Sequence, residues 1–264
     1  MRIWCQLPIA MPRSLYKSYY ELLQKDYDLV KRADTETVIK DVPSGLPMPN
    51  LVAYFGLRQA NSREVLKSML QAEREGFDAI AGACFADAAI QAAGNLMDIP
   101  VIGPGETSMY LARMMGARFA IIASGPNSIP GTDLQIDALN MRPSVIDYRP
   151  VRYLTLDATT FSSCLGGNYG PVIENFKEVA QGCIKDGADV LIVGCGLFSP
   201  MLTVTGVRNI EGVPIIDPML VPLKFAEMMV DFKAAGMPVI SQKGLFLKAS
   251  REDIQTGCKS LGLV

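Results

Sequence analysis

Two residue types decide which proton chemistry is open to this 264-residue chain, which has six cysteines and no histidine. Without histidine, a Ser-His-Asp triad, a Cys-His dyad and every zinc site that uses an imidazole are excluded. No two cysteines stand in a Cys-x-x-Cys spacing, which argues against a zinc ribbon or a thioredoxin-type redox site. Proton transfer must therefore use Cys, Asp, Glu, Lys or Tyr side chains.

An internal repeat singles out Cys84 and Cys195. The segment EGFDAIAGAC ends at Cys84 and the segment DGADVLIVGC ends at Cys195, and each places an aspartate six positions before the cysteine. A second apolar run with a proline follows in both halves, with Pro100 16 positions after Cys84 and Pro214 19 positions after Cys195. The pattern recurs after about 111 residues, so two halves of the chain are expected to be built alike.

Each of these two cysteines is predicted to stand at the C-terminal end of a parallel strand, where ligands bind in open α/β sheets. Backbone N–H groups of the following turn would favour a negative charge and lower the pKa of a thiol. If the two halves face each other, one thiolate could take a proton from one face of a substrate carbon while the opposite thiol returns one. The enolate-like intermediate needs hydrogen-bond donors, and the candidates are the backbone N–H groups of Phe85, Ala86, Asp87, Gly196, Leu197 and Phe198.

The remaining cysteines are expected to be packing residues, because cysteine is among the most buried residue types. A chain of this length with an apolar core has no need of disulfides, so reduced thiols are expected throughout. These packing cysteines are Cys5, Cys164, Cys183 and Cys258.

Short apolar runs bounded by Gly or Pro alternate with helical patterns, which predicts an α/β fold with parallel sheets. Val42–Asn50, with three prolines and one glycine, is expected to be a loop. Strands are predicted at Arg2–Leu7, Tyr27–Val30, Ala79–Cys84, Val101–Ile102, Arg118–Ala123, Ser144–Tyr148, Val190–Gly194, Pro214–Ile216 and Val239–Ile240. Helices are predicted at Ser14–Leu23, Ser62–Glu75, Thr107–Met115, Gly131–Ala138, Gly170–Lys185 and Pro222–Ala234.

Composition narrows the class of protein. Hydrophobic residues make up 49% of the chain and charged residues 20%, which is globular composition. A net charge of −2 argues against an electrostatic nucleic-acid binder. No secretory signal and no uninterrupted apolar stretch of about 18 residues is visible. We therefore expect a cytoplasmic protein that binds a small-molecule substrate and neither nucleic acid nor membrane.

Several of these segments resemble the aspartate/glutamate/hydantoin racemase superfamily. They are Ala83-Cys84-Phe85-Ala86-Asp87-Ala88, Val193-Gly194-Cys195-Gly196-Leu197, the strand at 99–103 followed by Glu106, and Gly212-Val213-Pro214-Ile215-Ile216-Asp217. The resemblance runs from Arg2 to about Val230 and is closest to the hydantoin racemase branch, in which the first cysteine stands in a Cys-Phe-x-Asp context.

The resemblance implies two similar lobes, each a mostly parallel sheet flanked by helices, related by a pseudo-twofold axis with the active site between them. Lobe one would comprise residues 1–104 plus 219–264 and carry Cys84, and lobe two residues 105–218 with Cys195. It further implies a racemase or epimerase without cofactor or metal, acting on a hydantoin or amino-acid-like substrate with Cys84 and Cys195 as the acid/base pair. A homo-oligomer is expected.

Substrate contacts are expected from residues at strand ends and from the first turn of one helix. The candidates are Gln6, Pro8, Phe85, Ala86, Asp87, Glu106, Ser124, Gly125, Gly196 and Leu197. The chain departs from the hydantoin racemase branch at Gln6-Leu7-Pro8, where that branch has Asn-Pro-Asn. It departs from glutamate racemases after Cys195, where they have Thr-His, so a glutamate racemase of that kind is not expected.

Two other functions stay open on the residues alone. One is a cis–trans isomerase or decarboxylase of the same superfamily acting on a small dicarboxylate, and the other is a non-catalytic protein that binds a small ligand. Retention of two thiols favours a racemase, epimerase or isomerase over a decarboxylase, and a binding protein would not need paired thiols at strand ends.

Overall fold

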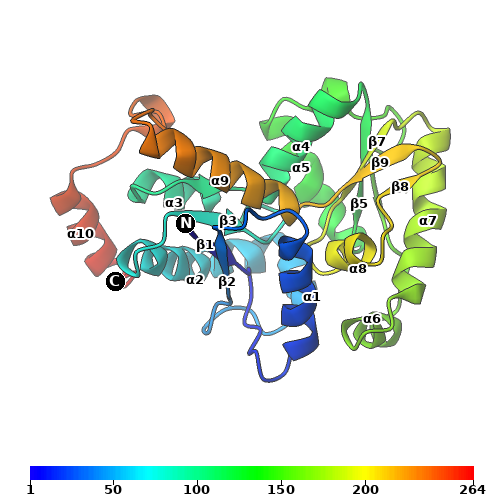
Figure 1. Cartoon of the computed structure of the whole chain (residues 1–264), viewed down its shortest axis with the longest axis horizontal. Coiled ribbons are helices and arrows are strands. Elements are labelled where there is room, and N and C mark those ends of the chain that lie inside the picture. Colours follow the sequence, from blue (N-terminus) through cyan, green and yellow to red (C-terminus); the bar gives the residue numbers. More distant parts are fainter. The chain divides into compact units, whose positions relative to one another are not determined.

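Strands and helices alternate along the chain in the computed structural model, which describes the backbone of residues 1–264 and every side chain except those of Ala158 and Phe161 (Figure 1). The chain folds into two compact units. Unit 1 consists of Met1–Pro12, Lys31–Gly103 and Pro222–Val264, and unit 2 of Arg13–Val30 and Pro104–Val221. Both sheets are built from parallel strands apart from one short antiparallel pairing, so the predicted fold class is confirmed.

Unit 1 holds a four-stranded sheet in the order β2-β1-β3-β4. Its strands are β1 (Arg2–Gln6), β2 (Glu36–Lys40), β3 (Ala79–Gly82) and β4 (Val101–Ile102). Its helices are α2 (Phe55–Arg74), α3 (Ile90–Leu96), α9 (Leu220–Ala234, of which the first two residues belong to unit 2) and α10 (Arg251–Ser260).

Unit 2 holds a five-stranded sheet in the order β6-β5-β7-β9-β8. Its strands are β5 (Phe119–Ala123), β6 (Val151–Tyr153), β7 (Val190–Val193), β8 (Asn209–Ile210) and β9 (Val213–Ile216). Its helices are α1 (Lys17–Asp28), α4 (Pro104–Met115), α5 (Ile129–Ala138), α6 (Ala158–Leu165), α7 (Gly170–Lys185) and α8 (Ser199–Val204). The first four strands of this sheet follow the same order as those of unit 1, which is the structural form of the sequence repeat.

The core of unit 2 explains why β5 and β7 are continuous apolar runs. Alternate residues of β5 and β7, such as Ile122 and Leu191, face a cluster that includes Phe176 of α7 and Phe198 beside α8. The intervening residues are buried as well, so both faces of the sheet are covered. Leu22 of α1 belongs to the same cluster, and α1 packs along α8.

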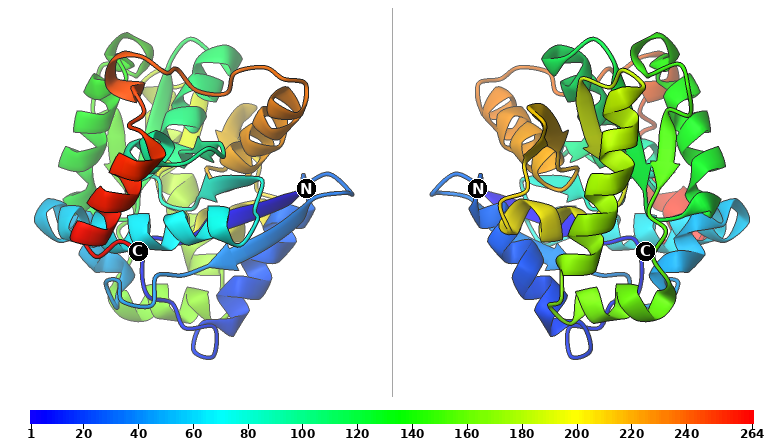
Figure 2. Two further views of the ribbon diagram at one scale, coloured as in Figure 1. Left: turned by 90° about the vertical axis from the view of Figure 1, so that its left-hand side faces the viewer. Right: turned by 90° about the vertical axis from the view of Figure 1, so that its right-hand side faces the viewer.

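The core of unit 1 joins segments that are distant in sequence. Trp4 of β1 packs edge-on against Phe77, with ring centroids 5.1 Å apart, in a cluster with Met69 of α2. Cys258 and Leu263 from the C-terminal region pack into the same cluster, so α10 is fastened to unit 1 (red in Figure 2).

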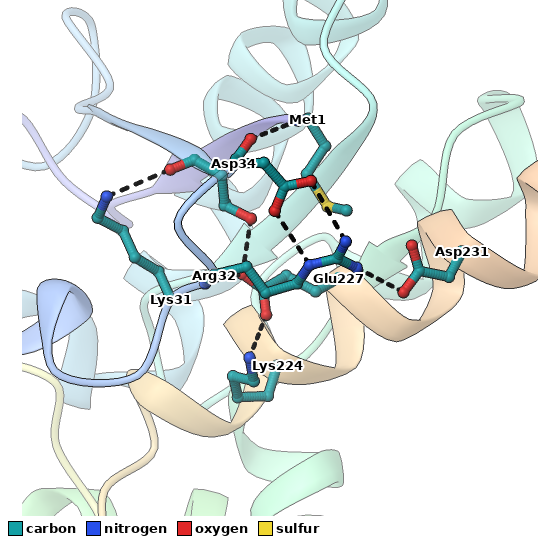
Figure 3. A network of polar contacts seen from close by, with 8 residues as sticks. Met1, Lys31, Arg32, Asp34, Lys224, Glu227 and Asp231 are labelled. Atoms are coloured by element: carbon teal, nitrogen blue, oxygen red, sulfur yellow. Dashed lines mark hydrogen bonds and ion pairs between the residues drawn. The ribbon is translucent and has the colours of Figure 1, made fainter.

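A polar network attaches α9 to the segment before β2 within unit 1 (Figure 3). The buried carboxylate of Glu227 accepts hydrogen bonds from the backbone N–H of Arg32 at 2.8 Å and from the hydroxyl of Thr35 at 2.7 Å, and it pairs with Lys224. The guanidinium of Arg32 pairs with Asp231 at 2.6 Å. Burial favours the neutral form of Glu227, but these hydrogen bonds outweigh it and lower the pKa of the carboxyl.

Three predicted strands are wrong. Tyr27–Val30 is the end of α1 and the turn after it, because Tyr27 is buried on the same helix face as Tyr20 and Leu23. Ser144–Tyr148 forms only an isolated bridge between Val145 and Phe119, and Val239–Ile240 lies in a loop.

The other predicted strands and all six predicted helices are present; β4 and α7 have the predicted bounds, and the rest have shifted ends. The lobe boundaries expected from the sequence place residues 13–30 in lobe one, whereas in the structure they belong to unit 2 because α1 packs on α8. Among the described residues, no helix is both long and apolar enough to cross a bilayer.

Candidate active site

The aspartate of each repeat holds the neighbouring strand in place. Asp78 accepts a hydrogen bond from the backbone N–H of Arg2 at 2.7 Å, at the start of β1. Asp189 accepts from the N–H groups of Ala117 and Arg118 at 2.8 and 2.9 Å, just before β5. β1 and β5 occupy the same place in the two sheets, so the repeated aspartate holds the equivalent strand in both units.

The glycine before each aspartate ends a helix. Gly76 after α2 and Gly187 after α7 have φ values of 72° and 96°, in the left-handed region where glycine is favoured. The N–H of the next residue bonds back to a helix carbonyl in each case, as in a Schellman motif. The repeat therefore encodes a helix end, a hydrogen-bonded corner and a strand that delivers a cysteine.

Cys84 and Cys195 each stand two residues beyond the C-terminal end of the equivalent strand, β3 in one sheet and β7 in the other. Both side chains are half-buried. The other cysteines are buried as predicted, and burial raises the pKa of Cys183 to about 11. No cysteine forms a disulfide among the residues described.

The segment after Cys84 is a tight, strained turn. The N–H of Asp87 donates to the carbonyl of Cys84 at 2.9 Å, and Asp87 and Ala89 have φ values of 50° and 64°. Such left-handed conformations are unfavourable for alanine and concentrate at functional sites. Phe85 is buried as a packing residue, whereas Ala86 and Asp87 are half-buried.

Asp87 lies directly against Gly103, which follows β4. A Cβ atom on Gly103 would come within 2.7 Å of Oδ1 of Asp87 and 2.8 Å of its Cγ. Glycine at this position therefore makes room for the carboxylate beside the turn that carries Cys84.

Gln6 and Pro8 lie near Cys84, but the side chain of Gln6 is used in hydrogen bonds within unit 1. All three residues line a cavity of about 10 Å³ in unit 1, too small for a ring-sized substrate. The buried amide of Gln6 accepts from Trp4 Nε1 at 2.7 Å and donates to the carbonyl of Leu7 at 2.8 Å. Substrate contacts from Gln6 and Pro8 stay predictions.

Cys195 lies among hydrogen-bond donors of unit 2. Burial raises the pKa of its thiol, while hydrogen bonds from the N–H of Leu197, the hydroxyl of Ser124 and the N–H of Phe198 oppose that rise. Three of the residues that the sequence singles out, Ser124, Leu197 and Phe198, are thus brought to one sulfur atom. Burial thus favours the neutral thiol of Cys195, and the three hydrogen bonds favour its thiolate. Such a balance suits a thiol that must both hold and release a proton.

Sequence reasoning misses Tyr19. Its ring is 2% exposed and its hydroxyl donates to the carbonyl of Gly196 at 2.9 Å, immediately after Cys195. Burial raises the pKa of Tyr19 well above its usual value, and the neighbouring Cys195 adds a smaller rise. The phenol therefore stays protonated. Its spacing on α1 looks like ordinary core packing, and no local signal distinguishes it.

A pair of buried carboxyl groups lies close to Tyr19. Asp26 is fully buried, and neither of its oxygens has a hydrogen-bond partner with good geometry, whereas Asp217 accepts from the hydroxyl of Thr203 and the N–H of Met219. Burial and the nearby Asp217 raise the pKa of Asp26 to about 9, and burial also raises that of Asp217. At neutral pH the pair therefore retains a proton on Asp26.

The remaining candidates are spread over unit 2. Glu106 lies exposed in the first turn of α4, where a negative charge is favourable in any case. Gly125 follows Ser124 in an extended conformation, and Gly196 is buried. Among the described residues, no cluster of three or more Cys, Asp or Glu side chains is placed to hold a metal ion.

Known proteins share both the sequence and the fold. The family model described as Asp/Glu/Hydantoin racemase matches residues 18–226. A hydantoin racemase from Pseudomonas sp. (strain NS671) is 29% identical over 203 residues, which are 76% of each chain. A hydantoin racemase from Rhizobium meliloti is 28% identical over 171 residues, 63% of this chain and 66% of that protein.

The solved structure of an allantoin racemase from Klebsiella pneumoniae has the same fold. Its TM-score is 0.77 at 21% identity, covering 95% of this chain and 94% of that one. The family match spans more than three quarters of the sequence and both repeated cysteines. This chain belongs to the Asp/Glu/hydantoin racemase family and is a racemase, an isomerase.

Proposed function

We propose that this racemase inverts a carbon acid in a hydantoin or similar cyclic ureide without a cofactor, using Cys84 and Cys195 as acid and base. The observation that carries the proposal is the equivalence of the two thiols. Each follows the same strand of the same sheet order by two residues, behind the same aspartate-anchored corner. A mechanism with one proton donor and one acceptor requires two such groups.

The chemistry of a hydantoin suits thiols. Its ring carbon bears a hydrogen next to a carbonyl, and removal of that hydrogen gives an enolate whose charge needs hydrogen-bond donors. The donors around Cys195 are the N–H groups of Leu197 and Phe198 and the hydroxyl of Ser124. Burial favours the neutral thiol of Cys195, the form that delivers a proton, so Cys84 would start as the base in one direction.

The substrate class is supported by three curated relatives named hydantoin racemases, which are 27–29% identical to this chain. The absence of histidine separates the chain from glutamate racemases with a Cys-Thr-His segment. A ring substrate carries less charge than a free amino acid, and Gly196 and Leu197 after Cys195 offer backbone groups rather than a charged side chain.

The test is racemisation of each separate enantiomer of a 5-alkylhydantoin, followed by chiral chromatography. Wild-type protein is expected to convert both enantiomers, and Cys84→Ser and Cys195→Ser to convert neither. Cys258→Ser is the matched control, because Cys258 is a buried cysteine of α10 that belongs to neither repeat. Turnover of maleate instead of hydantoin would show the isomerase alternative, and full activity of either active-site variant would refute the two-thiol mechanism.

A further inference from the structure

We propose that Tyr19 is a positioning residue for Cys195, whose buried hydroxyl fixes the carbonyl of Gly196 and thereby holds the next backbone N–H groups against the sulfur. The inference rests on the proposed function only in assigning a catalytic purpose to Cys195. Its structural part stands on contacts within unit 2.

The hydrogen bond from Tyr19 is the first step. Its hydroxyl lies 2.9 Å from the carbonyl oxygen of Gly196, and both residues are buried. A buried carbonyl without a partner is costly, so this contact determines which way the peptide between Gly196 and Leu197 faces. The N–H of that same peptide belongs to Leu197, the first of the backbone donors to the Cys195 sulfur.

Helix α1 makes the hydroxyl a rigid support. The helix packs along α8, and Leu22, one turn after Tyr19, enters the core cluster with Phe198. The carbonyl of Cys195 accepts from the N–H of Ser199 at 3.2 Å, so the turn is fixed at its other end as well. The hydrogen bond from Tyr19 fixes the rest of this turn, which consists of Gly196, Leu197 and Phe198.

The titratable groups around Tyr19 do not compete for its proton. They are Cys195, Asp26, Asp217 and Tyr20, with Arg208 near Asp26. Asp26 retains its own proton at neutral pH, and the surroundings of Tyr19 favour the neutral phenol. The hydroxyl therefore stays a donor over the range in which Cys195 must ionise.

The experiment measures the pKa of Cys195 directly, through the pH dependence of its alkylation by iodoacetamide, with the modified peptide identified by mass spectrometry. In Tyr19→Phe, the donors move away from the sulfur, and the alkylation pKa is expected to rise by about one unit, a roughly tenfold loss of thiolate. The kcat for hydantoin racemisation is expected to fall by a similar factor with KM little changed. Tyr27→Phe, a buried tyrosine two turns along α1, is the control and is expected to leave both values unchanged.

A second variant separates the hydrogen bond from the fold. 4-Aminophenylalanine at position 19 keeps a donor in the same place and is expected to restore the wild-type alkylation pKa. An unchanged pKa in folded Tyr19→Phe, or a shift of a unit or more in the aminophenylalanine variant, would overturn the inference. Because alkylation needs no turnover, absence of racemase activity in the wild type would refute the proposed function while leaving this result readable.

Discussion

The repeated aspartates support the two sheets by different numbers of hydrogen bonds, and the difference predicts unequal costs for the same substitution. Asp189 uses both carboxylate oxygens, one for the N–H of Ala117 and one for that of Arg118. In Asp189→Asn only one oxygen remains, and the other N–H then faces an amide NH₂. Asp78 accepts from one backbone N–H, that of Arg2, which the oxygen of Asp78→Asn still serves.

The magnitudes follow from the bonds lost. A hydrogen bond to a charged group contributes about 1.5–3 kcal/mol, and the exposure of both aspartates favours the lower end. Asp189→Asn is expected to reduce the free energy of unfolding by about 1.5 kcal/mol, and Asp78→Asn by about 0.5 kcal/mol because a neutral bond replaces a charged one.

Urea unfolding provides the assay. Circular dichroism follows both units, and the fluorescence of Trp4, the single tryptophan, follows unit 1. Equal losses in the two variants, or a larger loss in Asp78→Asn, would refute the assignment of these aspartates as strand anchors of unequal strength.

Three further predictions concern buried or crowded groups. Because the pKa of Asp26 is raised to about 9, the free energy of unfolding of the wild type is expected to fall as pH rises from about 4 to 9. Asp26→Asn is expected to lose this dependence in urea titrations, and parallel pH profiles of the two proteins would contradict the prediction. The pKa of Glu227 is lowered, so its effect on the pH dependence of stability is the reverse. Glu227→Gln should lower the melting temperature at pH 7 and lower it progressively less below about pH 4.5. The same difference between variant and wild type at every pH would contradict the prediction. Gly103→Ala should cost about 1–3 kcal/mol through its collision with Asp87, and adding Asp87→Ala should recover most of that in urea unfolding; no recovery would mean that the strain lies elsewhere.

The sequence predicts best where both faces of a strand are buried. β3, β5 and β7 are short apolar runs ended by glycine or a small residue, and that pattern locates all three. The edge strands β2, β6 and β8 escape prediction because polar residues interrupt or bound their apolar residues, so that none of them is a continuous apolar run.

The candidate site divides in the same way. Cys84 and Cys195 can be found in the sequence because the repeat marks them. The repeat also marks the two aspartates, but it does not show that they hold the neighbouring strands by hydrogen bonds. Tyr19 could not be predicted, since its partner Gly196 is 177 positions away and only the packing of α1 on α8 brings them together. Local patterns also cannot show that Gln6 uses its amide to bond Trp4 and Leu7.

Solvent deuterium exchange in the two cysteine variants tests the two-thiol mechanism most directly. Each enantiomer of a 5-alkylhydantoin is incubated in D₂O with Cys84→Ser or Cys195→Ser, and exchange at the ring carbon is followed by NMR. Each variant keeps one of the two repeated thiols, so neither is expected to racemise the substrate, and each is expected to exchange a different enantiomer. Exchange of the same enantiomer by both variants would show that the thiols do not serve opposite faces of the carbon.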